Sequence, residues 1–430
     1  MATKKTALAC GLVIYACVAA CAAAERHDYA KNRFSPEILT PPDYKTFRPP
    51  PAGQTFTCPV FGTEIHVLTD HHSVVGWNGE RSNFSIDDKH FVVGVKPGPD
   101  KKSLVHLYDG RSGAFIKTIP ITHFDSVRWG YHPKILFHFK DRQVRGYNVE
   151  TDEDTLIREF DEPVRLCGGD GNDFDDKGEW ILLNYGKKTG LRMFAFNVRT
   201  GQTKPEWNSL APKADVDYAS VTPSGKYVAV LGRSKNASPK NPHSGTGIYD
   251  LDGRFIRQLA PYHSHCDFGY VNGNDECIIM KGWGPTYAAW CRPRGVGTRD
   301  MLAISFAGGK VTKLTDGGSN RIQTAAVGDS NRRYVYVAYE AGNHNPDRKW
   351  DKYLGEIVEI PLDGSLRVRR LLHHRARSSI NRSHTFADQP ELWINHAGNR
   401  LFFRSNMALE QGSTKHKYGH DLFMIKIPPR

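Results

Sequence analysis

Cysteine is scarce in this sequence, which holds 8 cysteines among 430 residues. Five of them follow residue 24, and an odd number leaves at least one thiol unpaired or used on a metal. So few cysteines cannot build a disulfide scaffold, and a hydrophobic core must therefore stabilise the fold. The five are Cys58, Cys167, Cys266, Cys277 and Cys291.

Long apolar runs are absent after the first 24 residues, so no later segment predicts a transmembrane helix. The N-terminus has a basic pair at positions 4 and 5 and an apolar run over 6–20, shorter than the roughly 20 residues that span a membrane. This pattern predicts an export signal over residues 1–24. We expect the protein in the periplasm or anchored to the outer membrane of the cell envelope.

Two processing routes stay open at the end of this signal. The residues VAAC at 18–21 resemble a lipoprotein cleavage box, which would make Cys21 the lipidated first residue. The alanines before Glu25 suit ordinary signal cleavage equally well. A lipid on Cys21 is the one membrane attachment that the sequence predicts.

The chain also lacks a basic tail, although positive charge is in excess. It has 58 Lys and Arg against 46 Asp and Glu, a formal net charge of +12 that is spread along the chain. No helix-turn-helix, zinc-finger or single-strand-binding motif is found, so we expect no nucleic-acid partner. A basic exported protein instead suits anionic surfaces and polymers.

Helical periodicity is missing too. Residues 25–53 are polar and Pro-rich and predict a spacer. From there the domain at 54–430 consists of short β-type runs separated by Gly, Asn, Asp and Pro.

These β-type runs repeat. A tight turn followed by a strand recurs seven times, and further strands follow each copy, as in the four-stranded blades of a β-propeller. The seven pieces are SIDDKHFVVGV (85–95), GYHPKILFHF (130–139), FDDKGEWILLNY (174–185), VTPSGKYVAVLG (221–232), VNGNDECIIM (271–280), GDSNRRYVYVAY (328–339) and NHAGNRLFFRSN (395–406).

The seventh unit ends at 421–427 without a fourth strand, whereas the run at 62–70 precedes the first unit and looks like one. The sequence therefore predicts an all-β, seven-bladed β-propeller whose ring is closed by an N-terminal strand that completes the last blade. We expect this ring to be a monomer. A pair of β-sandwiches is the rival fold, and seven units of one type argue against it.

In a propeller the first strand of each blade lines the central channel, so the residues that precede each repeated turn should meet at one mouth. They are His123, Asp125, Asp170, Asn172, Asp215, Asp217, His263, His265, Asp267, Asn320, Gln323, His384, Gln389 and Glu391.

The longest loops, at 232–246, 282–300, 343–353 and 406–420, are expected on that same face, and long loops in a compact fold often carry function. Aromatic faces stack on sugars, and arginine forks hold carboxylate or sulfate oxygens, so these loops suit an anionic glycan that carries uronate or sulfate. Ordinary solvated loops are the alternative. The candidate substrate-binding residues are Trp283, Arg292, Arg294, Arg348, Trp350, Lys417 and Tyr418.

Two segments resemble a known family. HSHCDFGYVNGNDECIIM (263–280) and SHTFADQPELWINHAGNRLFFRSN (383–406) are similar to blade-five and blade-seven segments of the oligogalacturonate lyases. The resemblance implies a seven-bladed propeller that cleaves uronate oligomers by β-elimination around a manganese ion. Propeller-type ulvan lyases share this architecture.

The resemblance also implies a metal site. His265 matches the metal histidine of blade five, and Gln389 and Glu391 stand where the family carries a pair of histidines. Oxygen donors suit manganese or calcium, so His265, Gln389 and Glu391 are the expected ligands of a divalent metal. A strand-start histidine held by backbone hydrogen bonds is the alternative for His265.

Elimination removes the proton beside a carboxylate and needs a base, a charge clamp and a donor for the leaving oxygen. The candidates are His263 and His384 as base or ligand, and Tyr287 as proton donor. The function classes left open are this lyase and a non-catalytic propeller that binds carbohydrate or protein. Hydrolysis by facing carboxylates such as Asp217 and Glu391 is a third.

Overall fold

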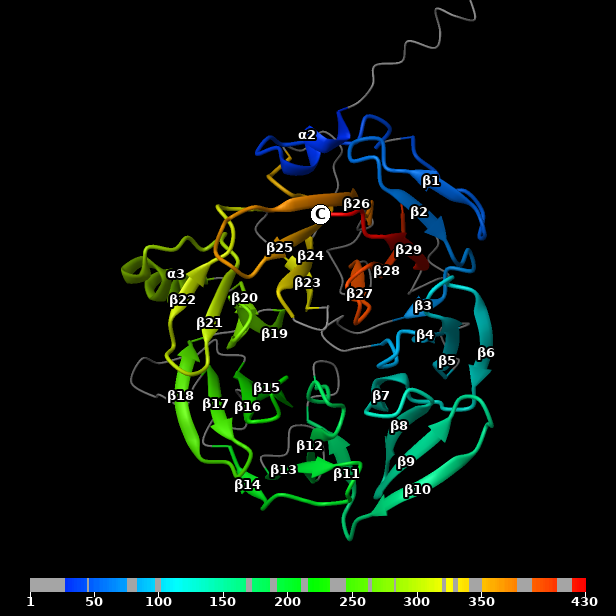
Figure 1. The fold of residues 1–430 in the computed structure, drawn as a ribbon, viewed down its shortest axis with the longest axis vertical. Coiled ribbons are helices and arrows are strands. Elements are labelled where there is room, and N and C mark those ends of the chain that lie inside the picture. Colours follow the sequence, from blue (N-terminus) through cyan, green and yellow to red (C-terminus); the bar gives the residue numbers. More distant parts are fainter. Residues whose placement is uncertain are drawn as a thin grey trace, which may run out of the picture.

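The computed structural model forms seven antiparallel sheets arranged around one axis (Figure 1). The predicted all-β, seven-bladed β-propeller is confirmed. In most blades the first strand lies nearest the axis and the last lies at the rim, as β19 and β22 show (Figure 1). The structure describes residues 28–44, 46–75, 83–96, 102–167, 172–185, 192–209, 216–232, 245–261, 265–281, 284–318, 322–327, 332–339, 350–376, 389–407 and 420–430.

The first three blades follow one another along the chain. Blade one holds β3 (Val74–Val75), β4 (His90–Val95), β5 (Leu104–Asp109) and β6 (Phe115–Ile119). Blade two follows the 3-10 helix η1 (Phe124–Ser126) and holds β7 (Val127–Trp129), β8 (Ile135–Lys140), β9 (Gln143–Asn148) and β10 (Asp154–Glu159). Blade three holds β11 (Val164–Leu166), β12 (Trp180–Tyr185), β13 (Arg192–Asn197) and β14 (Trp207–Asn208).

The next three blades repeat this order. Blade four holds β15 (Val216–Val221), β16 (Tyr227–Gly232), β17 (Thr246–Asp250) and β18 (Phe255–Ala260). Blade five holds β19 (Cys266–Val271), β20 (Asp275–Met280), β21 (Leu302–Ser305) and β22 (Val311–Lys313), with α3 (Gly284–Cys291) and the 3-10 helix η3 (Arg292–Arg294) between β20 and β21. Blade six holds β23 (Ile322–Val327), β24 (Tyr334–Tyr339), β25 (Glu356–Pro361) and β26 (Arg369–His373).

Blade seven combines both ends of the chain. Its strands are β27 (Glu391–Ile394), β28 (Arg400–Ser405), β29 (Asp421–Lys426), β2 (Glu64–Val67) and β1 (Thr55–Thr57). β2 pairs antiparallel with β29, and the hydroxyl of Thr69 donates to Asp421 Oδ1 at 3.0 Å. The N-terminal strands therefore cover an edge of β29 that would otherwise be unpaired.

The middle strands are apolar on both sides because neighbouring blades cover both sheet faces. In β12, Ile181 and Leu183 pack with blade two, while Leu182 between them packs with blade four. All three are fully buried, and burying such a side chain contributes about 1.5–3 kcal/mol. These repeated apolar interfaces hold the ring together.

Two properties expected from composition can be compared with this structure. Its cysteines from Cys58 to Cys291 are all free and buried. Within the described ranges there is no helix with the length and apolar character of a membrane span.

The described part of the Pro-rich segment 25–53, predicted to be a spacer, lies against blade six. It contains the short helix α2 (Tyr29–Phe34), which contacts β26. Asp43 accepts from Arg375 Nη2 at 2.6 Å, and the Arg375 guanidinium lies 3.9 Å from the ring centroid of Phe47. Buried arginines of β26 and its continuation therefore bind this N-terminal segment.

One of these arginines is fully enclosed. Arg370 Nε donates to Glu356 Oε2 at 2.7 Å, and its Nη1 donates to the carbonyl of Glu37 at 2.7 Å. Both charged side chains are 1% exposed. Burial raises the pKa of Glu356, and Arg370 opposes that shift. The pair joins β25, β26 and the N-terminal segment.

We predict that Arg370→Met lowers the free energy of unfolding by about 3–5 kcal/mol, because it leaves Glu356 buried without its cation. Urea unfolding followed by tryptophan fluorescence measures the loss. The control is Arg254→Met on an exposed turn, expected to change stability by under about 0.5 kcal/mol. Equal small effects of both substitutions would contradict a structural role of the pair.

Stability should also fall in acid because of His373. Burial lowers the pKa of His373 well below its ordinary value, and the charges of Arg370 and Arg375 lower it further. A hydrogen bond to the backbone of Leu39 opposes this shift but does not cancel it. His373 therefore binds a proton more readily in the unfolded chain than in the folded one. Its contribution to the free energy of unfolding is complete above about pH 6.5 and falls below that pH, by up to about 1.4 kcal/mol per pH unit. His373→Gln should flatten the slope of unfolding free energy between about pH 7 and about pH 5.5. An unchanged slope would show that His373 does not titrate on unfolding.

Candidate functional site

The described part of the predicted mouth includes the entries of β19 in blade five and β27 in blade seven. His265 directly precedes β19, Gln389 precedes β27, and Glu391 begins it. Both strands contact β23, which lies between them. The predicted catalytic residues His263 and His384 lie outside the described residues. The same holds for Asp170, Asp215 and Asn320 of the predicted mouth and for the loop residues Trp283, Arg348, Lys417 and Tyr418.

Glu391 is already engaged by a cation. Its Oε1 accepts from Arg404 Nη2 at 2.6 Å, and both side chains are 3% exposed. The two residues are direct cross-strand partners in β27 and β28. Gln389, two residues earlier, is also buried. Glu391 therefore acts as the partner of a buried guanidinium. This pairing argues against both roles predicted for its carboxylate, as a metal ligand and as a hydrolytic group.

The expected divalent-metal site can be tested against these contacts. Among the described residues, no group of three or more His, Cys, Asp and Glu side chains is placed to hold a metal ion. His265 is half-buried and belongs to blade five, whereas Glu391 pairs with Arg404 in blade seven. His265, Gln389 and Glu391 therefore do not by themselves fit a manganese site.

A lysine that sequence analysis overlooked lies at the end of β20. Lys281 is 2% exposed, and its ammonium lies 5.8 Å from the ring centroid of Tyr339 in blade six. Burial lowers the pKa of Lys281 to about 7, and the positive charge of Arg299 adds to this shift. The negative charge of Asp300 opposes it. The sequence does show a lysine directly after an apolar strand. It does not show the packing that lowers the pKa of this lysine.

The loop after Lys281 directs its side chains to two different places. Tyr287 on α3 is fully buried and stacks on Trp290 at a centroid distance of 5.7 Å. Arg292 and Arg294 on η3 are exposed, and the Arg294 guanidinium lies 4.2 Å from the Trp290 centroid. The fold thus places the predicted proton donor in a hydrophobic core and not on a surface.

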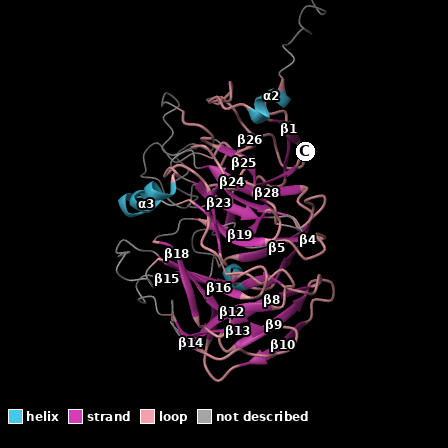
Figure 2. Cartoon of the chain, turned by 60° about the vertical axis from the view of Figure 1, so that its left-hand side comes forward, coloured by secondary structure: helices cyan, strands magenta, loops and turns pink. Residues whose placement is uncertain are grey.

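α3 itself lies outside the ring, beyond β22, whereas β19 and β27 lie near the axis (Figure 1). In the turned view α3 again projects from the side of the strands (Figure 2). The structure therefore does not bring Arg292 and Arg294 beside His265. Trp350, another predicted binding residue, contacts Tyr44 edge-on at a centroid distance of 4.9 Å and so packs on the N-terminal segment.

Polar side chains also meet at the opposite end of the channel, where the repeated turns lie. Asp176 in blade three accepts from Arg332 Nε in blade six at 2.5 Å and from the Tyr270 hydroxyl in blade five at 3.2 Å. Burial by itself lowers the pKa of Arg332, but the negative charges of Asp176 and Asp267 outweigh it and raise the pKa above its ordinary value. Blades three and six are on opposite sides of a seven-membered ring, so this pair bridges the axis.

We predict that Glu391→Gln lowers the free energy of unfolding by about 3–5 kcal/mol, because it leaves Arg404 buried without its carboxylate. Chemical unfolding in excess chelator measures this loss, with the exposed Glu153→Gln as control. A variant as stable as the parent in chelator, and weakened only in manganese affinity, would assign Glu391 to a metal instead.

Comparison with known proteins identifies the fold. No protein-family model matches the chain, and no curated protein matches its sequence. A solved oligogalacturonate lyase in complex with manganese is similar in structure, with a TM-score of 0.59, 10% sequence identity, and coverage of 87% of this chain and 96% of that one. An oligogalacturonate lyase from Vibrio parahaemolyticus has a TM-score of 0.58, with the same identity and coverage. This chain therefore has an oligogalacturonate lyase-like seven-bladed propeller fold, as its two resembling segments predicted.

Proposed function

We propose that this chain is a propeller lyase that cleaves uronate-containing oligosaccharides by β-elimination. One observation carries the proposal: the likeness to two oligogalacturonate lyases extends over 87% of this chain and nearly the whole of each lyase. At 10% identity the likeness concerns the fold, so the chemistry has to be argued from this chain's own residues.

Lys281 is the described residue that best suits the base. With its pKa near 7, a substantial fraction of its amine is neutral at neutral pH and can accept a proton. In the proposed step the proton beside the sugar carboxylate moves to Lys281 Nζ. The electron pair of the broken carbon–hydrogen bond forms the carbon–carbon double bond while the glycosidic carbon–oxygen bond breaks. The leaving oxygen takes up a proton. Catalytic contacts commonly tighten only when substrate is bound, so a covered amine is compatible with this role.

His265 is the mouth residue proposed to contact the substrate carboxylate. It is half-buried at the entry of an inner strand, and a protonated imidazole donates from both ring nitrogens. Because Glu391 is paired with Arg404, no step is assigned to a metal, and manganese enters as a variable of the assay. We also propose that the protein acts as an exported monomer in the cell envelope.

The proposal predicts a rise in ultraviolet absorbance as unsaturated uronate forms from polygalacturonate or ulvan, measured with manganese and with chelator. Lys281→Met should lower kcat about 10²–10⁴-fold, the usual contribution of a general base. For the parent protein, kcat/KM should increase with pH through about 7, because the neutral amine of the free enzyme is the active form. The control Lys310→Met, exposed between β21 and β22, should leave the rate unchanged.

His265→Ala should raise KM more than it lowers kcat if the imidazole binds the carboxylate. Absorbance that stays flat on every polyuronate, with folded protein and with manganese present, would overturn the lyase. It would favour the second candidate, a non-catalytic binding propeller. The buried Glu391–Arg404 pair supports that candidate, since it stands where the resembling family carries histidines.

A further inference from the structure

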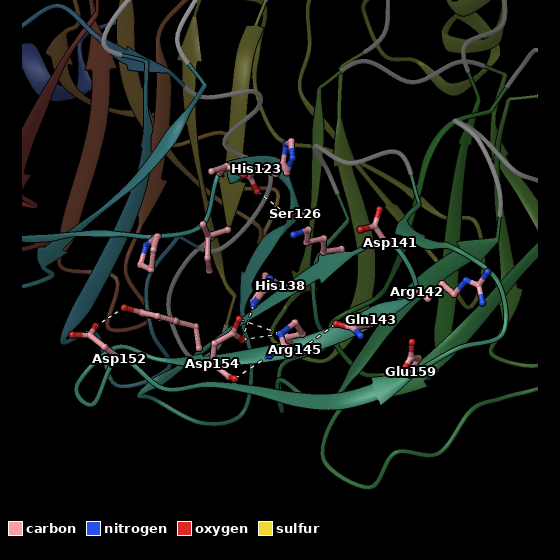
Figure 3. Close-up of a pocket in the computed structure, with 15 residues that line it drawn as sticks. His123, Ser126, His138, Asp141, Arg142, Gln143, Arg145, Asp152, Asp154 and Glu159 are labelled. Carbon is pink, nitrogen blue, oxygen red and sulfur yellow. Dashed lines mark hydrogen bonds and ion pairs between the residues drawn. The ribbon is translucent and has the colours of Figure 1, made fainter.

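A second hollow lies away from the central mouth, on blade two beside its connection to blade one (Figure 3). Its volume is about 590 Å³, within the range of small-molecule sites. The connection from β6 to β7 forms one side, and strands β8, β9 and β10 form the other. His123, predicted at the central mouth, lines this pocket instead.

The floor of the pocket is a fixed polar network. His138 Nε2 lies 3.0 Å from Asp154 Oδ1, and the His138 side chain is 7% exposed. Arg145 Nε lies 3.1 Å from each oxygen of Asp154, and its Nη1 donates to Gln143 Oε1 at 3.0 Å. Three neighbouring strands thus hold four polar side chains in one arrangement (Figure 3).

The same positions are apolar in blade five. The fourth and sixth residues of the second strand are Ile278 and Met280 in β20, and both fill the core shared with blade four. In β8 these positions are His138 and Lys140. Only the second residue of β8, Leu136, joins the apolar core with blade one. Folding alone favours an apolar residue at the buried position of His138, because buried polar groups cost free energy until they are hydrogen-bonded.

The pocket carries no excess of positive charge. Its lining holds three cations, Lys140, Arg142 and Arg145, and four carboxylates, Asp141, Asp152, Asp154 and Glu159. Asp154 pairs with Arg145, and Asp152 pairs with Lys117 outside the lining. Such a pocket does not select an anion. Instead it offers donors and acceptors side by side, which is what hydroxyl groups need, since each can both donate and accept.

Two groups remain available to a ligand. Across the described ranges, His138 Nδ1 and the ammonium of Lys140 form no hydrogen bond. The side chains of Ile121 and Tyr147 add apolar surface to the same wall. We propose that this pocket binds a neutral sugar of one or two hexose units, at a site separate from the proposed lyase centre and independent of its chemistry.

Titration calorimetry on the full chain tests this with D-glucose, D-galactose and D-mannose and with glucuronate and galacturonate. At least one neutral hexose should bind, and each uronate should bind more weakly than its neutral counterpart. His138→Ile, which introduces the blade-five residue, should weaken binding at least about tenfold by removing a polar partner. His265→Ala at the central mouth should leave hexose binding unchanged.

Lys140→Met is the second variant, used if His138→Ile does not give a cooperative thermal transition, and it should also weaken binding. Elimination activity of either variant should equal that of the parent, which separates this proposal from the proposed function. No binding of any neutral hexose, tighter binding of uronates, or unchanged affinity in the folded variants would each overturn it.

Discussion

Every blade of this ring is covered on both faces by its neighbours, and that constraint governs where chemistry can occur. A strand such as β12 has to be apolar on each side, since Ile181 and Leu183 meet blade two while Leu182 meets blade four. Polar groups are therefore restricted to strand entries, turns and loops, or else they need complete partners. The buried pair Glu356–Arg370 meets the second condition, and the buried Glu391 and Arg404 are ion-paired with each other.

This constraint also distinguishes the two proposed sites. At the central mouth, function is expected because strand entries from different blades meet there. On blade two it is expected because the buried His138 and the exposed Lys140 occupy positions that Ile278 and Met280 fill in blade five. A buried polar residue such as His138 in place of an apolar one is a good marker of a binding role.

The fold was predictable from the sequence because its signals are local and repeated. The turn Asp175–Gly178 and the apolar run after it specify a strand wherever they occur. The site was less predictable because its properties arise between elements. Lys281 owes its pKa to burial and to Arg299, and Arg292 is carried to the rim by α3, which the strand pattern did not indicate. Glu391 was correctly located at a strand entry, yet Arg404 on the next strand changes what its carboxylate can do.

The bridge between Asp176 and Arg332 has a consequence for the rigidity of the ring. It joins blades three and six across the axis, so these two blades cannot move apart at the turn end without separating a guanidinium from its carboxylate. The pairing of β2 with β29 closes the ring along its circumference. The ring is therefore held both around its edge and across its centre.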